Sequence, residues 1–327
     1  MTSEKTPLLA IVGPTASGKT ALSIALAKRL NAEIVCCDSM QLYRGMDIGT
    51  AKPTQQEMEG VPHHMLDVRE PDQSYSCAEY VADARACIET IGTHDRLPVL
   101  CGGTGLYLDS VLLGGSFEDT PSDPAVREQL QQIAEQYNGK DILYNRLCEI
   151  DPDSATAIHK NNVKRVIRAI EIYECCGTPK SVLDRNSRER GLLYNALVIG
   201  LRYHSRERLY DRIDQRVDIM LRDGLLDEVA RLKAAGVFAR SATAAQAIGY
   251  KELLGVLDGS ATLPQAIENL KLATRHYAKR QMTWFSAKPY VRWIYADTEQ
   301  GEMRAFADIL AEAMETVATW KARGDTV

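Results

Sequence analysis

The sequence predicts an α/β protein in which helices cover both faces of a parallel sheet and an all-helical domain is inserted into the core. Two observations predict this class. Apolar runs such as 8–12 and 97–101 show no alternation with polar residues, which is typical of strands buried on both faces. From about 124 to 184 the apolar residues follow only a helical period, with Val126 and Leu130 in one stripe and Val163 and Ile167 in another.

The remaining elements follow in order along the chain. The first part predicts strand 8–12, helix 19–30, strand 33–37, a long loop 38–73, helix 76–91, strand 97–101 and helix 104–113. A strand at 193–201 rejoins the sheet, and helices follow at 205–222, 224–235, 244–257, 262–285 and 303–321, with a short strand at 291–295. Turn-rich residues at 114–116 and 119–124 mark a linker. We therefore expect a core made of 1–117 and 191–327, with a helical insertion at 118–190.

Composition limits the class of protein. The chain has 327 residues and a net charge of −5, which argues against a broad nonspecific coating of nucleic acid or membrane and leaves local basic patches open. Its eight cysteines form no C-x-x-C pair, so we expect reduced, mostly buried thiols rather than a disulfide or zinc framework. The short polar N-terminus and the lack of an 18-residue apolar span predict a cytoplasmic protein that does not enter membranes.

The first candidate site is a glycine-rich loop between a strand and a helix. It has the pattern G-x-x-x-x-G-K-[ST] and consists of Gly13, Pro14, Thr15, Ala16, Ser17, Gly18, Lys19 and Thr20. Such a P-loop presents backbone N–H groups and a helix N-terminus to phosphate, with Lys19 as a mobile cation and Thr20 as a Mg²⁺ ligand. Nucleotides, ATP included, are common ligands of this motif. The motif does not identify the phosphate or the reacting atom.

Two further segments reach the same sheet edge. Asp38 follows the second strand, where it could act as a general base, as an outer Mg²⁺ ligand, or as a turn-capping residue. Gly102 and Gly103 follow a later strand, and Thr104 stands where a helix-capping hydroxyl is also expected. The adjacent His63 and His64 point to opposite faces of an extended chain, so we do not expect them to bind a metal.

Three basic ridges stand out in this acidic chain. Residues 271–296 hold six Lys or Arg and no acid, interleaved with aromatic residues, a composition that suits RNA with unstacked bases. The ridges are Lys271, Arg275 and Lys279; Lys160, Lys164 and Arg168 beside Arg165; and Arg208, Arg212 and Arg216. Each ridge could also be a solvated helix face, and the third could instead clamp phosphates.

Six segments, in order along nearly the whole chain, resemble the tRNA dimethylallyltransferase family. They are 13–20, 38–53, 63–67, 102–107, 247–252 and 278–285. The resemblance implies transfer of a dimethylallyl group from dimethylallyl diphosphate to N6 of adenosine 37 in tRNA, with Mg²⁺. It also implies a P-loop core whose helical insertion helps to clamp the anticodon stem-loop. The eukaryotic zinc finger is absent from the sequence, so the bacterial type is the closer match, and we expect a monomer.

The resemblance also implies roles for individual residues. Asp38 would be the base, and Thr15, Lys19 and Arg216 would hold the leaving diphosphate, with Mg²⁺ on Thr20. The implied tRNA contacts are Asp38, Ser39, Met40, Gln41, Thr104, Arg127, Asn162, Val163, Lys164, Arg165, Val166, His276, Tyr277, Ala278, Lys279, Arg280, Gln281, Met282 and Thr283. Some relatives carry Gln-Arg within the stretch that reads Asn162 to Arg165 here, so contacts in that stretch are less specific.

Three other functions fit parts of the pattern. A nucleotide kinase would share the phosphate loop and Asp38, but it would have no use for the acid-free aromatic segment 271–296, and consumption of ATP on an acceptor would reveal it. A nonenzymatic RNA-binding switch would turn over no allylic diphosphate. An adenylate isopentenyltransferase would prefer AMP to an anticodon stem-loop.

Overall fold

The computed structural model describes residues 5–113, 122–189 and 191–323. Within these ranges the chain divides into two compact units, one made of residues up to 108 and from 194 onward, the other of residues 109–193. The second unit is wider at both ends than the expected insertion 118–190. The predicted linker residues 114–116 and 119–121 lie outside the described residues.

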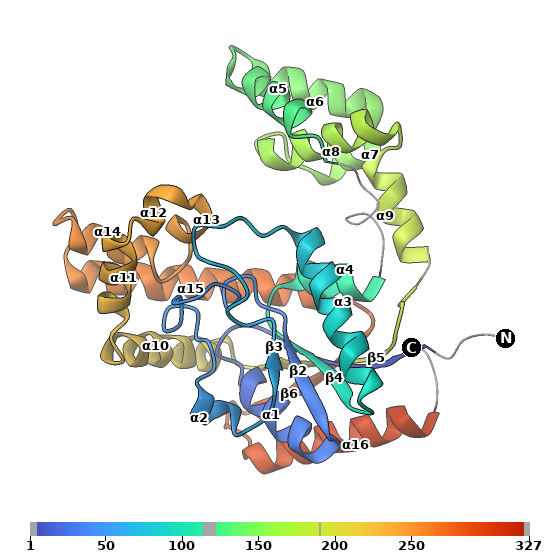
Figure 1. The fold of residues 1–327 in the computed structure, drawn as a ribbon, viewed down its shortest axis with the longest axis vertical. Coiled ribbons are helices and arrows are strands. Elements are labelled where there is room, and N and C mark those ends of the chain that lie inside the picture. The colour runs from blue at the N-terminus through green and yellow to red at the C-terminus, as the bar shows by residue number, and fades with distance from the viewer. Residues whose placement is uncertain (1–4, 114–121, 190, 324–327) are drawn as a thin grey trace. The chain divides into compact units, whose positions relative to one another are not determined.

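A six-stranded, wholly parallel sheet forms the centre of the first unit (Figure 1). Its strands are β1 (Pro7–Val12), β2 (Ala32–Cys36), β3 (His63–His64), β4 (Leu97–Cys101), β5 (Asn195–Arg202) and β6 (Val291–Tyr295), in the order β3-β2-β4-β1-β5-β6. The α/β class and the parallel sheet are confirmed. Strand β3 lies inside the expected loop 38–73. It was not predicted, because two residues are too few to show the alternation or apolar run of a strand.

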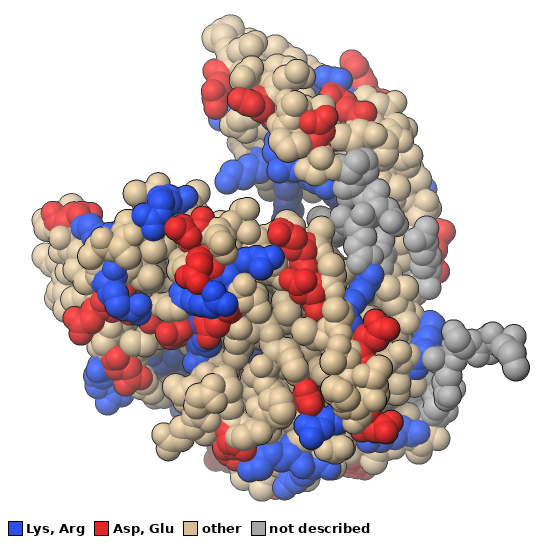
Figure 2. All heavy atoms as spheres, in the orientation of Figure 1, with Lys and Arg blue, Asp and Glu red and all other residues tan. Residues whose placement is uncertain are grey.

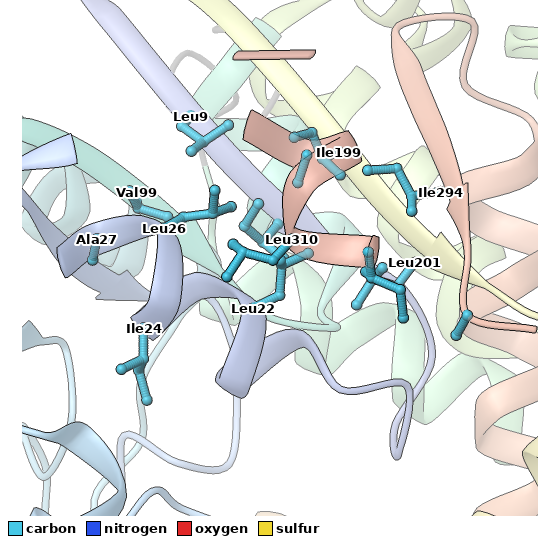
Figure 3. Packing of buried hydrophobic residues seen from close by; sticks show 14 of the residues in the cluster. Leu9, Leu22, Ile24, Leu26, Ala27, Val99, Ile199, Leu201, Ile294 and Leu310 are labelled. Carbon is cyan, nitrogen blue, oxygen red and sulfur yellow. The ribbon is translucent and has the colours of Figure 1, made fainter. Parts of the chain in front are cut away.

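Helices cover both faces of this sheet. As a result, five of the six residues of β1 are buried without alternation. Helices α1 (Lys19–Leu30) and α16 (Phe306–Arg323) pack against strands, and α3 (Cys77–Thr93) packs on β2 and β4. Leu9, Ile11, Leu22 and Leu26 belong to one continuous apolar core with side chains from β5 and α16 (Figure 3). The core therefore holds the loop after β1 at a fixed place.

The strand order places three predicted segments at one edge. Because all strands are parallel, the loops after β1, β2 and β4 leave at the same carboxyl edge, and β4 lies between β1 and β2. Helix α4 (Gly105–Leu113) begins directly after the β4 turn. A short helix, α2 (Gln55–Met58), interrupts the long loop after β2 and is capped by Thr54 and Glu57 in a reciprocal capping box.

The C-terminal half adds helices beside that edge. They are α10 (Arg206–Arg222), α11 (Leu225–Ala234), α12 (Val237–Arg240), α13 (Ala242–Ala245), α14 (Lys251–Leu257) and α15 (Leu263–Ser286). The predicted single helix 244–257 is wrong. Gly249 has φ of 99°, which a continuing α-helix cannot accommodate, so α13 ends before it and α14 begins after it.

The insertion is helical, and it is described here by itself. It contains α5 (Pro124–Glu135), α6 (Gly139–Ile150), α7 (Pro152–Ala157), α8 (Val163–Cys176) and α9 (Lys180–Glu189). Leu130, Leu143, Leu147, Val166 and Ile170 form its own apolar core. A core of this kind allows the unit to keep its shape without support from the sheet.

Surface chemistry agrees with the low net charge. Acidic and basic side chains are interspersed over the visible face rather than gathered into one basic surface (Figure 2).

All eight cysteines are unpaired, but only Cys36 and Cys37 are buried, so the expectation of mostly buried thiols is wrong. Cys148 and Cys176, on insertion helices, are exposed. Within the ranges 5–113, 122–189 and 191–323, no helix combines the length and apolarity that a membrane span requires.

Candidate active site

The phosphate loop has the strained backbone that its glycines predict. Gly13 has φ of 137°, and a Cβ there would lie 2.4 Å from the carbonyl oxygen of Leu201 on β5. Gly18 has φ of 95° where α1 begins, and Ala16 also adopts a positive φ of 62°. Only a loop held by surrounding structure keeps such conformations, and curled N–H groups at a helix N-terminus form an anion site.

Lys19 lies folded against its own loop. Its Nζ donates a hydrogen bond of 2.7 Å to the carbonyl oxygen of Pro14. Burial, together with the nearby Arg216 charge, lowers the pKa of Lys19 to about 8, although Cys101 and Asp38 oppose the shift. An anion bound in the loop would favour the charged amine, so Lys19 is placed to respond to a phosphorylated ligand.

Two arginines of α10 reach the phosphate loop. Arg212 Nε donates 3.0 Å to the carbonyl oxygen of Ala16, and an Nη1 of Arg216 lies 3.4 Å from Thr15 Oγ1. Burial, followed by the Arg212 charge, lowers the pKa of Arg216. The third arginine of the ridge, Arg208, turns away and donates to Gly301. The clamp interpretation therefore fits two of the three ridge arginines.

Asp38 lies half-buried after β2 and faces the same cavity as Lys19. Its Oδ1 accepts a 3.0 Å hydrogen bond from the backbone N–H of Met40. Loss of water raises the pKa of Asp38, and the N–H of Met40, the Lys19 charge and the N–H of Gln41 oppose that rise. A carboxylate with a raised pKa is a stronger proton acceptor than an ordinary aspartate.

Thr104 holds the segment that follows Asp38. Its Oγ1 accepts a 3.0 Å hydrogen bond from the backbone N–H of Ser39, and its own N–H donates 3.1 Å to the carbonyl oxygen of Cys37. The hydroxyl thus orients the loop beside Asp38. The turn between β4 and α4 and the turn after β2 are consequently one rigid structure.

A single cavity of about 370 Å³ joins these parts of the first unit. It extends from Thr15, Lys19 and Arg216 to Asp38 and then to Tyr277 on α15. Apolar side chains line part of it, namely Ile34, Val217, Met220, Ile248 and Leu270. A volume of this size fits a small ligand with both an anionic and an apolar part.

The predicted contacts on α15 divide into two groups. His276, Lys279, Arg280 and Thr283 are exposed, Tyr277 and Met282 are half-buried, and Ala278 and Gln281 are buried. Arg280 lies over the Tyr277 ring, 5.7 Å from its centroid. The exposed group can contact a macromolecule, whereas the side chains of Ala278 and Gln281 cannot.

Gln281 instead joins two loops of the site. Its Oε1 accepts a 2.8 Å hydrogen bond from the backbone N–H of Thr15, and its Nε2 donates 2.9 Å to the carbonyl oxygen of Gly103. A Cβ on Gly103 would lie 2.0 Å from Gln281 Nε2, which explains that glycine. No local sequence signal distinguishes this role from a surface contact.

Two of the three cations of the basic ridge on α15 are structural. Lys271 pairs with Asp218 at 2.7 Å, and Arg275 forms a two-pronged ion pair with Asp214, both partners lying on α10. These pairs fasten α15 to the helix that carries Arg212 and Arg216. The interpretation of this ridge as an RNA-binding face therefore applies only to its C-terminal part, at Lys279.

The predicted insertion contacts also divide. Arg127 and Arg168 both pair with the fully buried Glu171, so they hold the insertion together. Val166 is 1% exposed and belongs to the insertion core. Asn162, Lys164 and Arg165 are exposed and Val163 is half-buried, near the start of α8.

His63 and His64, in the first unit, contact the carbonyl of Val61 and the carboxylate of Glu33, respectively.

Fold and site together define a phosphate-loop enzyme in which a phosphate cradle and a half-buried carboxylate share one cavity. The chain belongs to the IPP transferase family, whose profile matches residues 41–288. A tRNA dimethylallyltransferase of Bacillus subtilis is 51% identical over 293 residues, which cover 90% of this chain and 92% of the relative.

Two solved structures are also similar. The full-length tRNA isopentenylpyrophosphate transferase of Bacillus halodurans matches with a TM-score of 0.72 and 44% identity, covering 98% of each chain. A eukaryotic dimethylallyltransferase described as acting on tRNA matches with a TM-score of 0.79 and 30% identity, covering 96% of this chain and 80% of that one. The family resemblance found in the sequence is confirmed.

Proposed function

We propose that this enzyme transfers a dimethylallyl group from dimethylallyl diphosphate to N6 of adenosine 37 in tRNA and releases diphosphate. One observation carries the proposal: Lys19 and Arg216, which suit a leaving diphosphate, share a cavity with Asp38, which suits proton removal from an amine. Relatives named tRNA dimethylallyltransferase match about nine-tenths of the chain. The phosphate is thus the leaving group and not the centre of reaction.

The chain's own cations act on the leaving group. As the bond between the allylic carbon and the diphosphate oxygen breaks, negative charge gathers on the diphosphate. Lys19 belongs to the phosphate loop itself, and Arg216 and Arg212, one turn apart on α10, contact that loop from another element. Cations fixed where charge develops lower the barrier because they need no rearrangement during the step.

Asp38 acts on the acceptor. The N6 amine attacks the allylic carbon, the new N–C bond forms, and the amine proton passes to the Asp38 carboxylate. An adenine in a base stack cannot reach the cavity, so the target nucleotide must leave the stack at a cost of a few kcal/mol. The apolar lining at Val217, Met220, Ile248 and Leu270 suits the five-carbon group and excludes water from the reactive carbon.

Mg²⁺ fits the oxygen-rich end of the cavity. Thr20 and Asp38 both line it, and hydroxyl and carboxylate oxygens are ligands that Mg²⁺ accepts. The buried Ser17 hydroxyl of the phosphate loop has no hydrogen-bond partner among the residues that the structure describes, as expected for a cradle made for a ligand. We propose that Thr20 holds the ion, which when bound supplies charge neutralisation at the diphosphate.

Contacts with tRNA are proposed for each unit by itself, from its exposed residues. Lys279, Arg280 and Thr283 on α15, and Lys164 and Arg165 on α8, are exposed and suit phosphate contacts. We also propose that the enzyme acts as a monomer. The eight unpaired cysteines support a cytoplasmic location.

The test is incubation with labelled dimethylallyl diphosphate and bulk tRNA, followed by digestion to nucleosides. We expect the label in N6-(dimethylallyl)adenosine, and no label with Asp38→Asn within the time of one wild-type turnover. Labelled phosphate on RNA after addition of ATP would instead indicate a kinase. Tight tRNA binding without any labelled nucleoside would indicate a binding switch.

A further inference from the structure

In the segment 247–252 of the sequence, Ala-Ile-Gly-Tyr-Lys-Glu, Ile248 lines the cavity, but Tyr250 has no role in the transfer described so far. Within it, the Tyr250 side chain is fully buried, and its hydroxyl donates a 2.7 Å hydrogen bond to Oε1 of Glu228. Glu228, on α11, is itself only 4% exposed. Burial of a carboxylate costs folding free energy unless its oxygens accept hydrogen bonds. The other partners of Glu228 therefore indicate its role.

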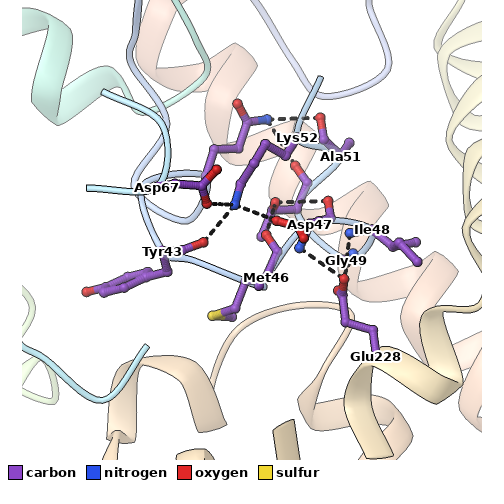
Figure 4. Close-up of polar contacts among 12 residues, drawn as sticks. Tyr43, Met46, Asp47, Ile48, Gly49, Ala51, Lys52, Asp67 and Glu228 are labelled. Carbon is purple, nitrogen blue, oxygen red and sulfur yellow. Dashed lines mark hydrogen bonds and ion pairs between the residues drawn. The ribbon is translucent and has the colours of Figure 1, made fainter. Parts of the chain in front are cut away.

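The other hydrogen-bond donors to Glu228 are three consecutive backbone N–H groups (Figure 4), and the Arg231 guanidinium forms a longer ion pair with Oε2 at 4.0 Å. Asp47 and Ile48 each donate 3.0 Å to Oε2, and Gly49 donates 3.1 Å to Oε1. With the Tyr250 hydroxyl, four donors meet one carboxylate. Glu228 thus takes the place of an anion in a small nest of backbone amides and fixes the path of that loop.

The loop is fastened from its other side as well. The Lys52 ammonium contacts Asp47 Oδ1 at 2.6 Å, Asp67 Oδ1 at 2.5 Å and the carbonyl of Tyr43 at 2.7 Å. A Cβ on Gly49 would lie 2.6 Å from the Tyr250 ring, so backbone rests directly on the ring. Glu228 and Tyr250 therefore hold the backbone while Lys52 holds the side chain of Asp47.

This fastened loop is a wall of the reaction cavity. Gly49, Thr50 and Ala51 line the cavity. The carbonyl oxygens of Thr50 and Ala51 accept hydrogen bonds of 3.0 and 3.1 Å from Nε2 of Gln41, and Gln41 Oε1 lies 3.3 Å from the Cys36 thiol. Gln41 ends the short segment that begins with Asp38. A continuous set of contacts consequently runs from Glu228 through the loop and Gln41 to the base.

We infer that Glu228, together with Tyr250, is a positioning residue that sets the loop 46–51 and through Gln41 the acceptor side of the cavity. The inference rests on the proposed function. The diphosphate side is held by other contacts, from Arg212, Arg216 and Gln281. Loss of Glu228 therefore affects binding and attack by the RNA adenine and leaves the hold on dimethylallyl diphosphate unchanged.

Glu228→Gln tests this inference because it keeps the side-chain shape. One oxygen becomes an NH₂ group that faces backbone N–H donors, so the nest loses acceptors and gains a donor. We expect kcat to fall at least tenfold and KM for an anticodon stem-loop to rise at least fivefold, with KM for dimethylallyl diphosphate within twofold of wild type. Tyr250→Phe removes one of four donors and leaves the carboxylate satisfied, so we expect a smaller effect in the same direction.

Asp297→Asn is the matched control. Asp297 is 1% exposed, lies in the same unit, and accepts backbone N–H bonds of 2.7 and 2.9 Å from His204 and Ser205, but it does not line the cavity. We expect it to lower the melting temperature without changing KM for the stem-loop. If Glu228→Gln behaves in the same way, or raises both KM values equally, the inference is overturned.

Hydrogen exchange separates this inference from the proposed function. The amides of Asp47, Ile48 and Gly49 should exchange at least a hundredfold faster in Glu228→Gln, while those of β1 and β4 keep the wild-type rate. Unchanged exchange at 47–49 overturns the inference even if transfer to tRNA is observed. Faster exchange there, with no transfer by the wild-type enzyme, supports the positioning role of Glu228 and refutes the proposed function.

Discussion

Replacing Lys279 and Arg280 together with alanine tests whether α15 binds tRNA through phosphate contacts. Both side chains are exposed, and among residues 5–113, 122–189 and 191–323 no carboxylate forms an ion pair with either. If each cation neutralises one phosphate of the anticodon stem, the slope of log K against log salt should weaken by about 1.8. At about 0.1 M salt the same loss corresponds to roughly 60-fold weaker binding.

The control pair lies on the same helix. Lys271 and Arg275 already pair with Asp218 and Asp214, so Lys271→Ala with Arg275→Ala should lower the melting temperature and leave the salt slope unchanged. Filter binding or fluorescence anisotropy with a labelled stem-loop at four salt concentrations measures both variants. Dimethylallyl diphosphate should bind the first double variant as it binds wild type. A wild-type slope in that variant would refute the assignment of tRNA contacts to α15.

Three further predictions concern the chemistry of the cavity. Asp38→Asn should keep tRNA affinity and slow transfer by about 10²–10⁴ in single-turnover assays, the usual contribution of a positioned base; a loss below tenfold contradicts that role. Because burial lowers the pKa of Lys19 to about 8, the amine loses its proton at a lower pH than an ordinary lysine, and kcat/KM for dimethylallyl diphosphate should decline as pH rises through about 8. Lys19→Arg should remove that decline, and its persistence would assign it to another group. Arg216→Ala should lower kcat/KM for dimethylallyl diphosphate by roughly 10- to 100-fold, as expected for loss of a charge-assisted hydrogen bond. The control is Arg208→Ala, which should change it less than twofold because the Arg208 guanidinium binds the carbonyl of Gly301. Equal losses in the two variants would argue against a specific clamp.

The sheet and its ligand edge could be predicted because their signals are local. An unbroken apolar run, a glycine turn and a helical period each lie within about 20 residues, and parallel pairing then brings the ends of the strands to one edge. Thr15, Lys19 and Asp38 consequently share a cavity, as their positions after β1 and β2 predict. The break of the predicted helix 244–257 at Gly249 was not predicted, because an isolated glycine inside a helical pattern is often tolerated.

Pairing between distant helices could not be predicted from the sequence. The ridge of Lys271, Arg275 and Lys279 has one period, yet its first two members are paired with α10 and its third is exposed. The difference depends on where Asp214 and Asp218 lie in space, which no spacing within α15 reveals. Gln281 shows the same limit, because an amide that directly follows the exposed cations Lys279 and Arg280 looks like a surface residue until α15 is placed against the phosphate loop.

Buried acids are the second feature that the sequence hides. Glu171 and Glu228 resemble ordinary acids of amphipathic helices, but one neutralises Arg127 and the other satisfies the loop 47–49. Their partners lie about 44 and 180 residues away along the chain. The sequence does not show which acids are buried, because their partners are distant along the chain. Such residues are identified only from the structure.

The most direct test of the account measures both products of one reaction. An anticodon stem-loop with adenosine at position 37 is incubated with labelled dimethylallyl diphosphate, and released diphosphate and modified nucleoside are counted together, with AMP as acceptor in a parallel reaction. We predict one diphosphate per N6-(dimethylallyl)adenosine, modification at position 37 alone, and no transfer to AMP. Diphosphate release without modified adenosine, or transfer to AMP at the rate seen with the stem-loop, would contradict the account.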